Sequence, residues 1–534
     1  MLINFNKMSN GDIISRQLED SDINEMKKAI EEKLLESYFI ESEGVKIEIN
    51  IISKEHIPIY KLIIPEMDVA TMALLDDIKE KLIGAVEVNP SEIFDPKLLN
   101  ELKNELKKDA STLIDEELPN LSQELKDHFI VTIIHELLGL GDIEFLLDDD
   151  QIEEVVVNSA KEPIRIYHKK YGWLKTNLKP KSEAQISNYA NIIARRVGRE
   201  ITTLNPLLDA HLMTKDRANA ILSPISTKGN TITIRKFARD PWTATDFIKN
   251  NTVNSEILAL IWLCIQYEMN MIISGGTGSG KTSFLNVCMP FIPPNHRIIS
   301  IEDTRELQLP KFLFWCPLTT RPPNPEGKGE VTMLDLVVNS LRMRPDRIIM
   351  GEIRKQREAE VLFEAMHTGH SVYATLHADT CEQTINRLVN PPINIPESML
   401  GAVHLNVVMF RDRRRGIRRV FEIGEFVEEV GEYRRVSYHP RILYRWDPRT
   451  DTIVPEEQES ISLYDKISAH TGLTHEEINA DIEMKKRILE WMVEYNVSKI
   501  DDLGRIMNIY YTNTESLIEV VNRNDDPKVI LRMI

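Results

Sequence analysis

The sequence predicts an α/β protein: a mainly parallel sheet, preceded by a smaller α+β domain and followed by a mostly helical tail. From residue 255 to about 430, short apolar runs alternate with helical patterns, which is typical of parallel strands joined by crossover helices. Before residue 240, short runs with period two surround helical segments, and beyond 440 the pattern is mostly helical. With 534 residues and 42% apolar residues, the chain is long enough for several ordinary folded domains.

Composition excludes several classes of protein. No stretch of 18 apolar residues exists, and the run from Ile257 to Ile265 reaches only nine, so we expect no membrane span. The first residues lack the pattern of a signal peptide, which predicts a protein that stays in the cytoplasm. Four widely spaced cysteines without a CxxC argue against a disulfide framework and a thiolate zinc site; they are Cys264, Cys288, Cys316 and Cys381.

Charge is distributed unevenly along the chain. The net charge is −18, and residues 1–150 alone carry about −19. Such an acidic front half does not suit a protein that wraps around a phosphate backbone. One basic run, Arg411 to Arg419, favours a solvated turn between two strands; contact with a subunit, a nucleic acid or an anionic membrane is the alternative.

Two modules are expected ahead of residue 241. The acidic α/β module, 1–130, has an alternating strand pattern at Val45–Ile51, a partner at Ile57–Ile64 and charged helices over 97–127. The second module, 131–240, is predicted to be α+β. Its strands are expected at 154–157, 164–167 and 231–234, around a helix at 183–197.

Three further regions follow. A polar stretch, 241–254, is predicted to be a hinge linker, and 255–430 is predicted to hold the parallel sheet. The last region, 431–534, is expected to be mostly helical. Within it, Thr474 and Glu477 form a capping-box pattern at the start of a helix.

A phosphate-binding motif follows the first apolar strand of the sheet region. The strand Met269–Ser274 leads into a full match to G-x-x-x-x-G-K-[ST], and a helical segment comes next. Glycines allow backbone N–H groups to surround a β-phosphate, Lys281 is expected to reach the β/γ-phosphate oxygens, and Thr282 to bind Mg²⁺. The predicted nucleotide-binding residues are Gly275, Gly276, Thr277, Gly278, Ser279, Gly280, Lys281, Thr282 and Ser283.

Three more predicted strands end in polar residues. They deliver Glu302 with Asp303, then Glu352, then His377. Ligands of an open parallel sheet lie beyond the carboxyl ends of its strands, so four such strand ends predict a nucleotide hydrolase, and we expect an ATPase.

Phosphoryl transfer requires Mg²⁺ and a carboxylate that orients or deprotonates the attacking water. Glu302 and Glu352 are the two candidates, one for the attacking water and the other for the water shell of the metal, and the sequence leaves their order open. Thr282 and, through a water, Glu352 are the predicted metal contacts. His377 could sense the γ-phosphate through a hydrogen bond or could be purely structural.

In this order the motifs resemble the ATPases of the type II/type IV secretion superfamily, the motors of pili, archaella and secretion machines. The matching segments are the Walker A loop 275–282, the Asp box 301–306, the Walker B segment 341–352 and the His box 368–377. The stretch 320–330 is similar to the tight-adherence and archaeal branches, and the tail around 443–447 resembles the archaeal group. The paired CxxC element of bacterial type II motors is absent from the sequence.

The resemblance implies a RecA-like ATPase lobe, a sensor-like N-terminal domain and a homo-hexameric ring that binds ATP and Mg²⁺ at the lobe interface. It implies that Arg217 and Arg235 reach the γ-phosphate from the smaller domain, as arginines that stabilise transition-state charge do. A surface role in ion pairs is the alternative for both.

It also implies a cytoplasmic motor, peripheral at the inner face of the membrane through a polytopic platform protein, that drives assembly of pilin-like filaments or secretion. A nucleic-acid translocase is the alternative, although no nucleic-acid partner is expected, and a nucleotide-gated scaffold with little turnover is a third possibility.

Overall fold

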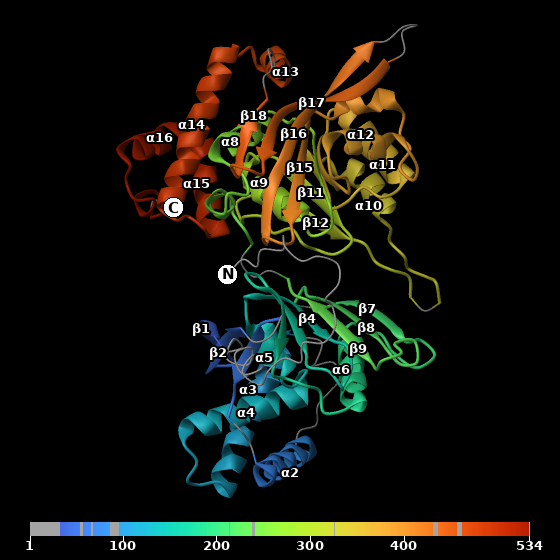
Figure 1. Ribbon diagram of the computed structural model, residues 1–534, viewed down its shortest axis with the longest axis vertical. Coiled ribbons are helices and arrows are strands. Elements are labelled where there is room, and N and C mark those ends of the chain that lie inside the picture. Colours follow the sequence, from blue (N-terminus) through green and yellow to red (C-terminus); the bar gives the residue numbers. More distant parts are fainter. Residues whose placement is uncertain are drawn as a thin grey trace, which may run out of the picture. The chain divides into compact units, whose positions relative to one another are not determined.

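The computed structural model describes residues 33–53, 57–65, 68–85, 96–212, 214–237, 241–324, 326–430, 436–456 and 462–532. The chain divides into two compact units, 1–237 and 238–534, which are described separately below (Figure 1). Each unit contains one nine-stranded sheet.

The sheet of the first unit combines strands from both modules expected in this part of the chain. In order across the sheet, its strands are β1 (Lys33–Ser42), β2 (Val45–Ser53), β3 (Ile59–Ile63), β6 (Gly172–Thr176), β5 (Arg165–His168), β4 (Ile152–Val157), β9 (Thr231–Arg235), β8 (Arg217–Ile221) and β7 (Leu207–His211). The strands expected near 45–51, 57–64, 154–157, 164–167 and 231–234 are all present.

The expected boundary at residue 130 is wrong as a structural division. Strand β3 pairs in parallel with β6, with Ile59 opposite Lys175, so the first three strands extend the same sheet. Residue 130 also lies inside a helix, α4. The helices of this unit are α2 (Val69–Ala85), α3 (Pro96–Glu117), α4 (Gln123–Leu138), α5 (Ile143–Asp148) and α6 (Glu183–Arg196).

The sheet of the second unit is mainly parallel on one side and antiparallel on the other. Its strand order is β12 (Phe314–Thr319), β11 (Arg297–Glu302), β13 (Arg347–Met350), β14 (Ser371–Leu376), β10 (Met271–Gly275), β15 (Leu405–Asp412), β16 (Ile417–Val430), β17 (Val436–Asp447) and β18 (Thr452–Pro455). The pairs from β12 to β15 are parallel, and β16 to β18 continue the sheet as antiparallel strands. The sheet therefore extends past residue 430, into the region that was expected to be mostly helical.

The segment 241–254 is not the linker that its polar composition suggested. It contains helix α7 (Ala244–Lys249), which begins in a capping box between Thr243 and Asp246. Phe247 on this helix is only 6% exposed and belongs to the core of the second unit. The burial of one aromatic residue thus overrides the polar pattern, and a hinge role for this segment stays a prediction.

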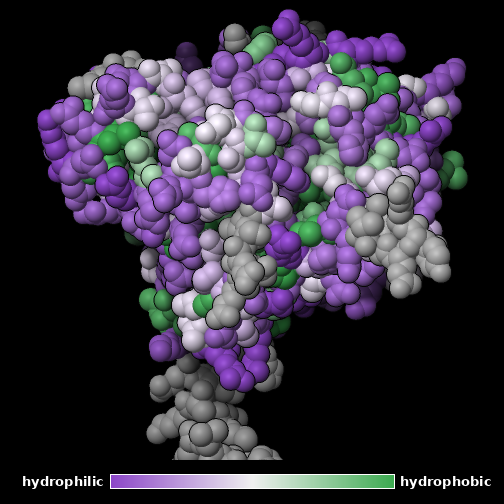
Figure 2. All heavy atoms as spheres, turned by 90° about the horizontal axis from the view of Figure 1, so that it is seen from above, coloured by the Kyte–Doolittle hydropathy of each residue, from purple (hydrophilic) through white to green (hydrophobic). Residues whose placement is uncertain are grey.

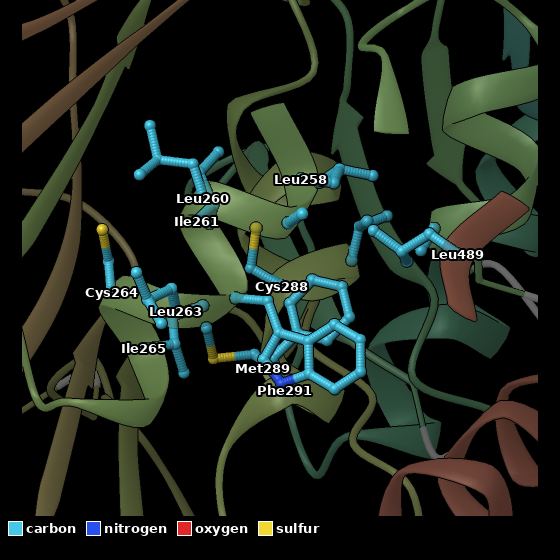
Figure 3. Close-up of a cluster of buried hydrophobic side chains, with 14 of the residues drawn as sticks. Leu258, Leu260, Ile261, Leu263, Cys264, Ile265, Cys288, Met289, Phe291 and Leu489 are labelled. Atoms are coloured by element: carbon cyan, nitrogen blue, oxygen red, sulfur yellow. The ribbon is translucent and has the colours of Figure 1, made fainter. Parts of the chain in front are cut away.

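Helix α8 (Ser255–Gln266) contains the nine-residue apolar run and is buried along nearly its whole length. Figure 3 shows its side chains gathered with Cys288 of α9 (Lys281–Cys288), with Met289 and Phe291 of the short helix η2 (Met289–Phe291), and with Leu489 of α14 (His475–Glu494). The run is apolar on all sides because α8 has neighbours on all sides.

The other helices of this unit flank the sheet or form the tail. They are α10 (Met333–Ser340), α11 (Gln356–His367), α12 (Cys381–Val389), α13 (Ser462–Thr471), α15 (Ile500–Thr512), α16 (Thr514–Arg523) and α17 (Lys528–Leu531). Thr474 caps α14 as expected, in a capping box with Glu477. Among the described residues, no helix is both long and apolar enough to cross a bilayer. The face shown in Figure 2 is mostly hydrophilic, with apolar side chains in small separate groups.

Candidate active site

The loop between β10 and α9 has a backbone that only glycine accommodates at two positions. A Cβ on Gly275 would lie 2.4 Å from the carbonyl oxygen of Met409 and 2.5 Å from Ser279 Oγ. Gly278 has a φ of 71°, in the left-handed region that L side chains rarely adopt. The predicted strand–loop–helix context of the phosphate motif is therefore confirmed, and the loop is shaped by close backbone packing.

Lys281 is held inside this loop. Its side chain is buried, and Nζ donates hydrogen bonds to the carbonyl oxygens of Gly275 (2.9 Å) and Gly276 (3.0 Å). Burial lowers the pKa of Lys281, while Glu352, Asp379 and Glu306 act in the opposite direction. Ser279 Oγ also donates to the Gly276 oxygen, at 2.8 Å. The polar donors of the loop thus converge on its own concave side.

The strands that were expected to end in polar residues are neighbours in the sheet. Strands β11, β13, β14 and β10 are consecutive and parallel, so their carboxyl ends lie along one edge. From this edge, His377 contacts both the loop and Glu352. Its Nδ1 lies 3.3 Å from Lys281 Nζ, and its Nε2 lies 3.2 Å from Glu352 Oε1.

The protonation of His377 follows from these contacts. Burial, and then the Lys281 ammonium, lower the pKa of His377, while Glu352 opposes the shift. Because an ammonium group only donates, Nδ1 must be the acceptor, and a neutral ring then carries its proton on Nε2, facing Glu352. Lys281, His377 and Glu352 therefore form one continuous chain of polar contacts.

Arg354 continues this chain to the Asp box. Its Nε donates to Glu352 Oε2 at 2.8 Å, and its Nη1 donates to Asp303. Both ion pairs are partly exposed. The sequence offered no firm role for Arg354, because its partners come from two different strand ends.

Glu302 lies in a different environment from Glu352. It is only 2% exposed, and its Oε1 accepts hydrogen bonds from the backbone N–H groups of Glu306 (2.9 Å) and Leu307 (3.0 Å). Burial raises its pKa to about 7, against the effect of these two hydrogen bonds. Its Oε2 is buried and finds no hydrogen-bond partner among the described residues. Glu302 thus braces its own loop, whereas Glu352 belongs to the chain that reaches Lys281.

Thr282 and Ser283 stand in the first turn of α9, and both are partly exposed. Hydroxyl groups at a helix N-terminus, next to a glycine cradle and a buried lysine, fit a phosphate chain with Mg²⁺. Thr277, on the outside of the loop, is exposed.

Arg217 and Arg235 lie together in the first unit. They are register partners on strands β8 and β9, and both are exposed. Arg217 forms two hydrogen bonds with the carboxylate of Asp209, at 3.1 and 2.8 Å. Arg235 lies opposite Glu154 of β4.

Two arginines beside the phosphate loop escaped the sequence analysis. Arg418 Nε donates to the Gly278 oxygen at 3.1 Å, and Arg411 Nη1 lies 2.7 Å from where a Cβ of Gly278 would be. Both come from the basic run 411–419, which was expected to be a solvated turn. Only its middle fits that expectation: Arg413, Arg414 and Arg415 are exposed. The available signal was the spacing, since a hairpin centred on residues 413–416 brings Arg411 and Arg418 opposite each other.

The chain is similar to known proteins in sequence. The model of the type II/IV secretion system protein family matches residues 150–411. The chain is 36% identical over 407 residues to the uncharacterized protein MJ0900 of Methanocaldococcus jannaschii, covering 75% of this chain and 72% of that protein. It is 28% identical over 311 residues to the type IV secretion system protein PtlH of Bordetella pertussis, covering 52% and 91%.

The chain is also similar to solved structures, at lower sequence identity. The VirB11 ATPase of the Brucella suis type IV secretion system is 25% identical, with a TM-score of 0.27, covering 53% of this chain and 92% of that one. The pilus retraction motor PilT with bound ADP is 17% identical, with a TM-score of 0.37, covering 67% and 93%. Because both TM-scores are low, the fold rests on the strand order given above. With the family match and the relative from M. jannaschii, the chain belongs to the type II/IV secretion system ATPase family.

Proposed function

We propose that this protein is a Mg²⁺-dependent ATP hydrolase whose turnover drives a secretion or pilus-assembly machine. The observation that carries the catalytic part is the chain of polar contacts from Lys281 through His377 to Glu352, next to the glycine loop. It joins a phosphate-binding cation to a carboxylate that can act on water.

The phosphates of ATP would bind to hydrogen-bond donors that already lie together in the loop. Lys281 Nζ and Ser279 Oγ donate to carbonyl oxygens, and a charged phosphate oxygen is a stronger acceptor than either carbonyl. These donors could therefore exchange the carbonyl oxygens for phosphate oxygens without a change in the backbone of the loop. When bound, Mg²⁺ would neutralise phosphate charge, with the hydroxyl of Thr282 as the ligand from this chain.

Between the two candidate carboxylates, the geometry favours Glu352 for the attacking water. The Glu352 side chain is 20% exposed, so water can reach it, and it contacts His377 and accepts a hydrogen bond from Arg354. Glu302 uses one oxygen to hold the turn at Glu306 and Leu307, so we assign it a positioning role. His377 would then transmit the state of the phosphate site from Lys281 to Glu352.

The process is inferred from the family. We propose a cytoplasmic homo-hexameric motor, peripheral at the inner face of the membrane, that docks on a polytopic platform protein to assemble pilin-like subunits or to secrete. Arg217 and Arg235 are proposed to supply positive charge to the γ-phosphate in the assembled ring. Two register partners on one exposed face offer guanidinium groups side by side, as a multiply charged phosphate requires.

The test of the catalytic proposal is Glu352→Gln. We expect phosphate release to fall by about 10²- to 10⁴-fold, because the carboxylate can no longer accept a proton, while the Kd for ATP stays within a few-fold. Glu364→Gln, an exposed carboxylate on α11, is the matched control and should leave both values unchanged. Turnover near wild type in Glu352→Gln would contradict the assignment.

Single-stranded DNA added to the same assay addresses the alternative function. A motor of secretion should hydrolyse ATP at the same rate with and without DNA. Stimulation by DNA that disappears steeply with added salt would instead identify a nucleic-acid translocase.

A further inference from the structure

We propose that Arg411 and Arg418 form a subsite for the nucleoside side of the bound nucleotide, where their guanidinium groups contact the α-phosphate. This inference rests on the proposed function, since it concerns the same loop. It assigns a nucleotide-binding role to two residues of the basic run, for which the sequence motifs predict none.

The first step is the placement of the two side chains. Arg411 on β15 and Arg418 on β16 are directly opposite in the antiparallel register, so they point to the same face of the sheet. Strand β15 is also the parallel neighbour of β10, which leads into the glycine loop. The pair therefore stands beside the loop by virtue of the strand order.

The second step is contact with the loop itself. Arg418 Nε donates to the Gly278 carbonyl at 3.1 Å, and the Arg411 guanidinium packs where a side chain on residue 278 would be. Because C=O and the following N–H point in opposite directions across a peptide, this bond directs the Ser279 N–H away from Arg418. That N–H indeed donates to the Gly276 oxygen at 3.3 Å, on the other side of the loop.

The third step is the side of the loop on which the arginines lie. In the order β13, β14, β10, β15, β16, the strands that deliver Glu352 and His377 are on one side of β10, and the strands that carry Arg411 and Arg418 are on the other. If the γ-phosphate faces Glu352, the nucleotide extends across the loop toward the arginines. These then meet the α-phosphate rather than the γ-phosphate.

Two other arginines of the basic run bind carboxylates. Arg419 is 5% exposed and binds both carboxylate oxygens of Asp451 at 2.7 Å. Arg415 forms a partly exposed ion pair with Asp412 at the turn. Within the run, the two described guanidinium groups in contact with the loop are those of Arg411 and Arg418.

The experiment measures the Kd of ADP and of a non-hydrolysable ATP analogue, each with Mg²⁺, by calorimetry on the full chain. We expect Arg411→Ala and Arg418→Ala each to weaken both nucleotides by about tenfold and by the same factor, because the lost charge-assisted contact involves a phosphate that both share. Arg418→Lys should recover part of the loss by keeping the charge. Arg414→Ala, an exposed arginine of the same run, should bind like wild type.

Two outcomes would overturn the subsite: unchanged Kd values in both alanine variants, or a loss confined to the ATP analogue, which would place the arginines at the γ-phosphate. The melting temperature of each variant without nucleotide separates loss of binding from loss of folding, and Arg418→Lys carries the test if Arg418→Ala is unfolded. If the wild-type protein binds neither nucleotide, the proposed function fails as well. If the wild-type protein binds both nucleotides and the arginine variants bind them equally well, only the subsite is wrong.

Discussion

At the scale of single residues, two glutamates at neighbouring strand ends differ in their exposure to water and in their hydrogen-bond partners. Glu302 is buried against the backbone of its own loop, and burial raises its pKa to about 7. Glu352 is reached by His377 and Arg354, which are both side chains of the site. One carboxyl in a dry, braced position and the other beside polar partners would suit the positioning role proposed for Glu302 and the catalytic role proposed for Glu352.

The pKa of Glu302 makes the stability of the protein depend on pH. Its folded-state pKa is about 7, above its ordinary value of 4.5, so the folded chain keeps a proton that the unfolded chain releases. The stabilisation is complete below about pH 4.5 and is lost as pH rises to about 7, a change of about 3 kcal/mol. In Glu302→Gln this dependence should vanish, because an amide does not titrate.

Thermal unfolding of both proteins at pH 5 and pH 8 measures this difference. Wild type should lose stability relative to Glu302→Gln between the two values. Equal changes in the two proteins would show that Glu302 does not titrate in this range.

The sequence was sufficient to bring most of the site together, since Lys281, Glu352 and His377 follow consecutive parallel strands. The difference between Glu302 and Glu352 was not predictable, because it depends on which oxygens the backbone of residues 306 and 307 occupies. Arg411 and Arg418 were missed because their placement depends on a hairpin register that charge patterns do not reveal.

At the scale of elements, the tail is part of the core that supports the phosphate loop. Leu489 of α14 is 1% exposed and packs in the cluster around α8 that Figure 3 shows. Residues of α9, the helix that follows the glycine loop, belong to the same cluster. The tail therefore stabilises the helix on which Lys281 stands.

Leu489→Ala should accordingly destabilise the second unit by about 2–5 kcal/mol, as large-to-small changes in a packed core do. The apparent melting temperature of the full chain is the measurement. Leu204→Ala removes a leucine that is 90% exposed and should change stability by less than about 0.5 kcal/mol. Equal effects of the two substitutions would argue that the tail is only loosely attached.

The parallel strands were predictable because each is an apolar run that ends in polar residues. The joining of β3 to β6 was not, since Ile59 and Lys175 pair across more than a hundred residues that give no local signal. Helix α7 was not predicted because polar residues outnumber apolar ones over the segment 241–254, although Phe247 packs in the core.

At the scale of the whole molecule, the residues of the proposed mechanism are distributed over the two units. The second unit holds the loop and the carboxylates, and the first carries Arg217 and Arg235 on adjacent strands. In the proposed function, an arginine supplied by a separate unit would couple hydrolysis to the arrangement of the units, as a motor requires.

Arg217→Ala and Arg235→Ala should each lower kcat, by about 10³-fold if they act as arginine fingers. The Arg217–Asp209 pair is about half exposed on both side chains, so its loss should hardly affect folding. Steady-state phosphate release is the measurement, with Arg195→Ala, an exposed arginine at the end of α6, as the control. Rates of phosphate release within twofold of wild type in both variants would contradict this role and support surface ion pairing as the only role of the two arginines.

The most direct test of the account is a structure of the protein with Mg²⁺ and a non-hydrolysable ATP analogue. It should show the β-phosphate within the loop 275–281, the γ-phosphate between Lys281 and Glu352, and Glu302 still bonded to the backbone of Glu306 and Leu307. An analogue bound elsewhere, or a Glu352 carboxylate that points away from the γ-phosphate, would contradict the central claim.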